Sequence, residues 1–306
     1  MRRSILIILI ICLFTSIRAQ EEIKLRSGNI EMYGTIITPA KQTNRAILII
    51  VGSGSTDRDG NTKPVYVNNC LKMLAEELSV LGYCTLRYDK RGVGKSNSDS
   101  LKSENLRFEQ YVTDAIEWIN FLKKKYADIT VIGHSQGALV GMMAVQKTKV
   151  NRFISLAGLS EDAYTTVKRQ LSNQPKVVRD AAYPILDSLK NEIKVNEVPA
   201  YLNSLFNPKT QDYFISFMRY NPRVEITKIN CPILVIQGTS DLQITVEGAT
   251  EMSNNSQNST LKIIEGMNHV LKKSSNDVSE NMSTYNNAAL PLHPDLIMAI
   301  NQFLEK

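Results

Sequence analysis

Ser135 lies in the run Gly133-His134-Ser135-Gln136-Gly137, which fits the pattern G-x-S-x-G. The apolar residues 129–132 precede this run, and the helix-forming residues 138–143 follow it. A strand, a tight turn and a helix in that order hold a serine in a strained conformation, with its hydroxyl exposed at the positive end of the helix. This context predicts a nucleophilic serine, in preference to an incidental serine in a glycine-flanked turn.

A serine hydroxyl is a weak nucleophile unless a general base takes its proton, and the chain has three histidines. His134 adjoins the serine and is expected to point away from it, and His293 opens the last expected helix, as capping residues do. His269 follows the expected strand 261–264, at the edge of the sheet where ligands and catalytic groups concentrate in α/β proteins. His269 is therefore predicted to be the base.

The acid that orients this histidine is predicted to be Asp241. It ends the turn Gly-Thr-Ser-Asp after the strand 232–237, one strand–helix unit before His269. Serine, acid and histidine then follow one another along the chain in the order that this serine turn predicts. Two alternatives remain open: Asp241 caps the next helix instead, or the weaker candidate Asp212 is the acid.

The negative charge that develops on a carbonyl oxygen under attack needs hydrogen-bond donors. One is predicted to be the backbone N–H of Gln136, directly after the nucleophile. The other is expected from the glycine-rich turn 52–55, which follows the strand 46–51. Ser53 is the first choice in that turn and Gly54 the second.

These residues must be held by an alternation of short apolar runs and longer amphipathic ones. Strands alternating with helices predict a mostly parallel sheet with helices on both faces. The expected strands are 30–37, 46–51, 83–88, 129–133, 153–157, 232–237 and 261–264. The expected helices are 64–82, starting at Pro64, then 106–124, 136–147, 246–254 and 294–304.

The interval of about 159–229 interrupts this alternation. It contains no clear strand, and its amphipathic stretches at 163–171, 177–189 and 213–219 indicate helices. A departure of this length from the short connections of a compact domain is usually functional. We expect a helical cap over the site.

The first twenty residues have the layout of a secretory signal peptide. Arg2 and Arg3 precede an apolar run at 5–14, and a polar end with a small residue follows at 15–20. A permanent anchor needs roughly 20 apolar residues, so this run is too short. Residues 1–20 are expected to be removed, leaving 21–306 as one secreted or periplasmic domain without a stable membrane anchor.

Composition excludes several classes of function. Without Arg2, Arg3 and Arg18 the net charge falls from +6 to +3, which gives no case for nucleic acid. The remaining cysteines, Cys70, Cys84 and Cys231, are odd in number and widely spaced, which excludes a C-x-x-C metal site and a full disulfide framework. A single disulfide remains open, and no cofactor or metal is implied.

Three further stretches carry a resemblance to a known family. Residues 52–60 are similar to the oxyanion loop of bacterial esterases, residues 88–96 to a D-x-R-G-x-G-x-S turn, and 238–241 with 266–269 to acid and base loops. The chain thus resembles the α/β-hydrolase superfamily, in particular bacterial esterases, monoacylglycerol-lipase-like enzymes and serine aminopeptidase-like hydrolases. It departs from many relatives at 51–52, where Val-Gly replaces His-Gly.

The resemblance implies the α/β-hydrolase fold with a helical cap and a serine hydrolase that acts on small-molecule carboxylic esters. A serine aminopeptidase acting on short peptides is the alternative, and it would need carboxylates in the cap to hold a free amino terminus. The available ones are Glu161, Asp162, Asp180 and Asp187. A non-catalytic binding module is the third hypothesis, and it predicts a missing catalytic residue. The oligomeric state is left open.

Overall fold

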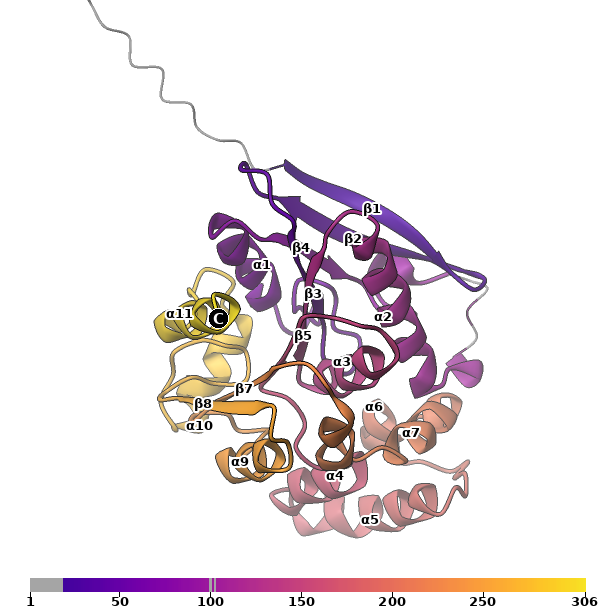
Figure 1. Ribbon diagram of the computed structural model, residues 1–306. Coiled ribbons are helices and arrows are strands. Elements are labelled where there is room, and N and C mark those ends of the chain that lie inside the picture. The colour runs from indigo at the N-terminus through magenta and orange to yellow at the C-terminus, as the bar shows by residue number, and fades with distance from the viewer. Residues whose placement is uncertain (1–18, 99–100, 102) are drawn as a thin grey trace, which may run out of the picture.

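The computed structural model describes residues 19–98, 101 and 103–306 (Figure 1). Eight strands form one sheet in the order β1-β2-β4-β3-β5-β6-β7-β8. The pairs β1–β2 and β2–β4 are antiparallel, and the other neighbours are parallel, which confirms the mostly parallel sheet. The strands are β1 (Ala19–Ser27), β2 (Ile30–Thr38), β3 (Arg45–Ile50), β4 (Cys84–Tyr88), β5 (Asp128–His134), β6 (Arg152–Leu156), β7 (Ile233–Gly238) and β8 (Ser259–Ile264).

Helices cover both faces of the sheet (Figure 1). Neighbouring residues of β3 point to opposite faces of the sheet: Leu48 packs in one apolar cluster and Ile49 in the other. A strand buried on both faces needs apolar side chains on both. One cluster includes side chains of α1 (Cys70–Val80) and α11 (Pro294–Leu304), and the other includes side chains of α2 (Phe108–Lys123), α3 (Gln136–Lys147) and α9 (Val246–Asn254).

The expected helix 64–82 is wrong at its start. The chain at 64–69 forms a turn, an isolated β-bridge at Tyr66 and an irregular stretch, and α1 begins at Cys70. The side-chain oxygen of Asn61 accepts hydrogen bonds from the N–H groups of Asn68 and Asn69, and Asn69 has a left-handed φ of 55°. These side-chain contacts compete with helix formation, so Pro64 does not begin the helix.

The interval between β6 and β7 consists of helices and turns. Figure 1 shows most of them gathered at one end of the sheet. We call residues 159–229 the helical insertion. Its α-helices are α4 (Ala163–Ser172), α5 (Lys176–Lys190), α6 (Asn203–Phe206), α7 (Gln211–Met218) and α8 (Pro222–Glu225), and α10 (Val278–Ser283) follows β8.

The expected signal peptide falls almost wholly outside the described residues. Its last two residues, Ala19 and Gln20, begin β1. Within the described part of the chain, no helix combines the length and the apolar character needed to cross a membrane.

Candidate active site

Ser135 lies in the sharp turn between β5 and α3. Its φ is 55° and its ψ is −124°, a conformation that L-residues adopt only under strain. The turn depends on Gly137, because a β-carbon there would lie 2.4 Å from the carbonyl oxygen of Ile50 in β3. Ser135 is thereby placed at the carboxyl edge of the sheet and at the N-terminus of α3.

Asp241 and His269 meet beside this turn, each in the loop after its strand. The Nδ1 of His269 lies 2.9 Å from Oδ2 of Asp241, which also accepts from Nε2 of Gln237 at 3.1 Å. The other carboxylate oxygen accepts from the N–H groups of Gln243 and Ile244, at 2.7 and 3.0 Å. A carboxylate only accepts, so Nδ1 donates and Nε2 of the neutral imidazole is left as the acceptor.

The carboxylate of Asp241 stays ionised in this setting. Burial raises its pKa, but the adjacent His269 and the hydrogen bonds from His269, Ile244 and Gln243 outweigh that effect and lower the pKa overall. A buried anion of this kind both fixes the imidazole and stabilises its protonated form.

Ser135 and His269 line the same cavity, which has a volume of about 150 Å³. The structure therefore brings together the three side chains that the sequence selected. Asp212 is elsewhere, in ion pairs with Arg107 at 3.1 Å and Lys194 at 2.6 Å.

Hydrogen bonds also show which residues cap the helices α9 and α11. Thr245, not Asp241, caps α9 by accepting from the N–H of Gly248. His293 caps α11 by accepting from the N–H of Asp295 at 3.2 Å.

His134 has a structural contact that its sequence position did not predict. Its Nε2 donates to the carbonyl oxygen of His269 at 2.9 Å. Burial, together with the electrostatic effect of the neighbouring His269, lowers the pKa of His134 to about 3, so the ring is neutral. His134 thus holds the backbone of the loop that carries His269.

The loop after β3 runs directly past Ser135. A β-carbon on Gly52 would lie 3.0 Å from that of Ser135, so a side chain at position 52 would crowd the serine. Ser53 lines the cavities on both sides of Ser135, whereas Gly54 lines only the larger one. Gln136 begins α3, where backbone N–H groups have no partner within the helix. Both predicted backbone donors therefore border the serine.

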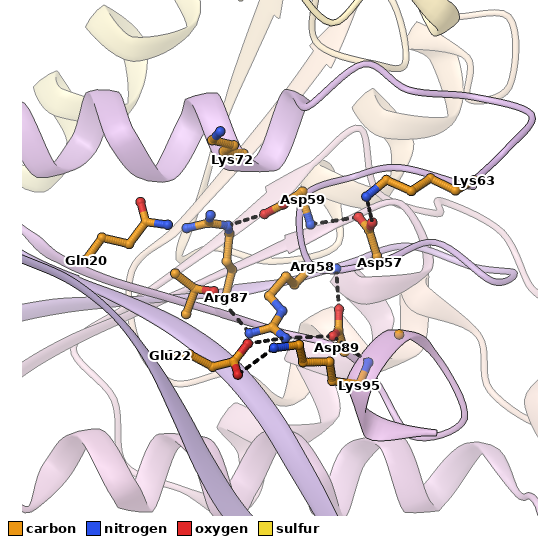
Figure 2. Close-up of a pocket in the computed structure, with 12 residues that line it drawn as sticks. Gln20, Glu22, Asp57, Arg58, Asp59, Lys63, Lys72, Arg87, Asp89 and Lys95 are labelled. Carbon is orange, nitrogen blue, oxygen red and sulfur yellow. Dashed lines mark hydrogen bonds and ion pairs between the residues drawn. The ribbon is translucent and has the colours of Figure 1, made fainter. Parts of the chain in front are cut away.

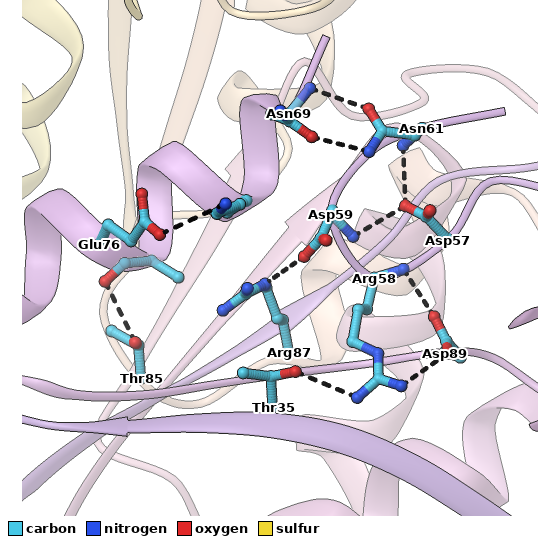
Figure 3. Close-up of polar contacts among 12 residues, drawn as sticks. Thr35, Asp57, Arg58, Asp59, Asn61, Asn69, Glu76, Thr85, Arg87 and Asp89 are labelled. Carbon is cyan, nitrogen blue, oxygen red and sulfur yellow. Dashed lines mark hydrogen bonds and ion pairs between the residues drawn. The ribbon is translucent and has the colours of Figure 1, made fainter. Parts of the chain in front are cut away.

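Ion pairs attach this loop to the sheet (Figures 2 and 3). Arg58 is buried, and its guanidinium lies 2.9 Å from Asp89, which also accepts from the N–H of Arg58. One residue further on, Asp59 pairs with Arg87 of β4 at 2.7 Å. The aspartate of the D-x-R-G-x-G-x-S turn therefore anchors the loop after β3, a role that the sequence motif alone did not disclose.

A larger cavity of about 400 Å³ extends from Ser135 under the helical insertion. Tyr213 of α7 lines it and donates to the side-chain oxygen of Gln136 at 2.8 Å, which ties the insertion to the serine turn. Most of its lining is apolar or aromatic: Leu106, Tyr111, Leu159, Ala163, Val167, Leu205, Tyr213, Phe214, Phe217 and Ile244.

Neither cavity is lined by an Asp or Glu among the described residues. The four carboxylates considered for an aminopeptidase have other partners. Glu161 lies 3.3 Å from Arg169, Asp180 pairs with Lys176, Asp187 accepts from Tyr164, and Asp162 caps α4. A cationic amino terminus would find no counter-charge in these walls.

The cysteines left open by the sequence are all free. Cys70 lines the smaller cavity, and burial raises the pKa of its thiol to about 12, so it is uncharged. Within the described part of the chain, no cluster of three or more His, Cys, Asp or Glu side chains is arranged to hold a metal ion.

The sheet order, the strained serine after β5 and the loops after β7 and β8 define the α/β-hydrolase class. Residues 68–274 match the family described as "Serine aminopeptidase, S33", and the chain belongs to this family of hydrolases. It is 26% identical to a monoglyceride lipase homolog of Monkeypox virus, over 68% of this chain and 79% of that protein. It is also 26% identical to the monoglyceride lipase of Rattus norvegicus, over 68% of this chain and 73% of that protein.

Two solved esterases share the fold. The ferulic-acid complex of Est1E from Butyrivibrio proteoclasticus has a TM-score of 0.62 at 18% identity, covering 92% of this chain and 98% of that one. The Pyrococcus furiosus esterase Pf2001 has a TM-score of 0.61 at 18% identity, covering 94% and 91%. At this identity the likeness concerns the fold. The curated relatives and the family together identify a hydrolase of the esterase and lipase kind.

Proposed function

We propose that this hydrolase cleaves carboxylic esters through an acyl-enzyme formed on Ser135. The observation that carries the proposal is the 2.9 Å hydrogen bond from His269 to Asp241 beside the strained serine. In this proposal His269 is the general base, and the N–H groups of Gln136 and Ser53 stabilise the oxyanion.

The reaction has two steps. Nε2 of His269 takes the proton of the Ser135 hydroxyl while the serine oxygen attacks the ester carbonyl. The protonated imidazole, stabilised by Asp241, then protonates the leaving alcohol as the carbon–oxygen bond breaks. Water attacks the acyl-enzyme with the same base and releases the acid.

The two cavities beside Ser135 favour an ester substrate with an apolar group on one side of the ester bond. About 400 Å³ lies within the range of small-molecule sites, which is about 300–1,000 Å³. The smaller cavity includes polar residues in its walls, among them Thr62, Asn68 and Tyr285. An unpaired ammonium group is costly to bury, so walls without carboxylates favour esters over peptides with a free amino terminus. The three roles of a triad are all filled, which argues against a binding module.

The test offers p-nitrophenyl esters of graded chain length and aminoacyl-nitroanilides to the wild type and to Ser135→Ala. Ester hydrolysis is expected in the wild type and is expected to fall by at least about 10³-fold in the variant. Ser172→Ala, at the exposed end of α4, is the matched control and keeps full activity. A preference for the anilides would contradict the ester proposal. A wild type that neither turns over substrate nor reacts with a fluorophosphonate would contradict the serine mechanism itself.

A further inference from the structure

Lys90 reaches the oxyanion loop from the end of β4. Its side chain is buried, and its amino group donates a hydrogen bond to the carbonyl oxygen of Gly52. Gly52 and Ser53 share one peptide unit, which is planar and trans, so its carbonyl and its N–H point in opposite directions. With the Gly52 carbonyl directed at Lys90, the N–H of Ser53 is directed away from Lys90, and Ser53 lines the cavities beside Ser135.

This peptide needs an external support. A β-carbon at position 52 would lie only 3.0 Å from that of Ser135, which favours glycine there, and Gly54 follows with a φ of +68°. Glycines on both sides of a serine make peptide rotation easy. A rotated peptide would present its carbonyl oxygen to the reacting carbonyl and repel the developing negative charge. The same close approach that favours glycine at position 52 thus removes the rigidity that a backbone donor needs.

We propose that Lys90 is the positioning residue of the oxyanion hole, because its hydrogen bond to Gly52 holds the Ser53 N–H toward the substrate. This inference rests on the proposed ester hydrolysis. Lys90 would act through the backbone and would not touch the substrate.

A role limited to balancing the charge of Asp89 fits the contacts less well. Asp89 already accepts from the N–H of Arg58 and of Lys95 and pairs with the Arg58 guanidinium. Burial lowers the pKa of Lys90 to about 7, with Asp89 and Asp57 opposing that shift. The amino group donates to a carbonyl in either protonation state, so the contact with Gly52 persists through neutral pH.

The experiment compares Lys90→Met, Lys90→Gln and the wild type in ester hydrolysis. Each rate is normalised to the fraction of protein that a fluorophosphonate labels. Removing one oxyanion donor costs about 10²–10³-fold in kcat. Lys90→Met leaves the Ser53 N–H in place but no longer oriented, so kcat should fall by less, about 10–100-fold. Lys90→Gln keeps a shorter donor, and its kcat should fall by about 3–10-fold. KM should change by less than about threefold, because the interaction is made in the transition state.

The control is Lys95→Met. This exposed lysine lies in the same turn and pairs with Glu22 at 2.8 Å, so its loss removes a cation without touching Gly52. It should leave kcat and KM within about twofold of the wild type.

Lys90→Met and Lys90→Gln variants with wild-type kcat would overturn the inference. So would losses confined to KM, or failure of both variants to fold, which would assign Lys90 to stability alone. An inactive, unlabelled wild type is a different outcome, since it refutes the proposed function before Lys90 is reached.

Discussion

Asp241→Asn tests the most constrained contact of the site. The carboxylate accepts four hydrogen bonds, two on each oxygen. An asparagine has one acceptor oxygen and one donor group. Its oxygen must face the N–H groups of Gln243 and Ile244, because the opposite orientation would set a donor against both. The new NH₂ group then faces Gln237 and His269.

Two consequences follow from that orientation. Nδ1 of His269 must become an acceptor, so its proton moves to Nε2, and the ring can no longer take the proton of Ser135. Loss of the correct tautomer costs about 10⁴-fold in kcat, or about 5.4 kcal/mol of transition-state stabilisation. Nε2 of Gln237 loses its carboxylate acceptor but keeps the carbonyl oxygens of Gly238 and Ile244, so the free energy of unfolding should fall only by the net worth of one hydrogen bond, about 0.5–1.5 kcal/mol.

The assay is kcat for a p-nitrophenyl ester, with thermal denaturation as the measure of folding. Asp212→Asn makes the same chemical change at the other candidate acid, whose partners are Arg107 and Lys194. It should stay within about twofold of the wild type, as partly exposed ion pairs contribute little. A folded Asp241→Asn variant that keeps kcat within tenfold of the wild type would refute the assignment of Asp241.

Two further predictions concern pH and processing. His134 has a folded-state pKa of about 3, against about 6.5 in an unfolded chain. The unfolded state therefore binds a proton that the folded state does not, and stability is lost as pH falls from 6.5 to 3, by up to about 1.4 kcal/mol per unit. Urea unfolding at pH 7 and pH 4 should show a weaker pH dependence for His134→Gln; equal dependence in both proteins would contradict this. We also propose that export removes residues 1–20, so the intact mass from an exporting host should lack them, and an uncleaved chain would count against it.

The alternating architecture and the residues of the candidate site could both be predicted from local patterns in the chain. Strands buried on both faces need continuous apolar runs, as at 46–50 and 129–132, and these runs are visible without any partner. The serine turn is equally local, because its glycines and its strained serine are within five residues of one another. Asp241 and His269 could be chosen because each directly follows a strand.

The contacts that hold those residues in place became visible only in the folded molecule. Lys90 meets Gly52, His134 meets the carbonyl of His269, and Tyr213 meets Gln136 across separations of 38, 135 and 77 residues. Such contacts leave no periodic or compositional signal, since a buried lysine and an exposed one have the same letter. The wrong prediction that the first helix begins at Pro64 also comes from contacts that the sequence pattern does not reveal. Side-chain hydrogen bonds from the loop's own asparagines outweighed a favourable helix pattern, and that competition is settled only when the loop packs against the site.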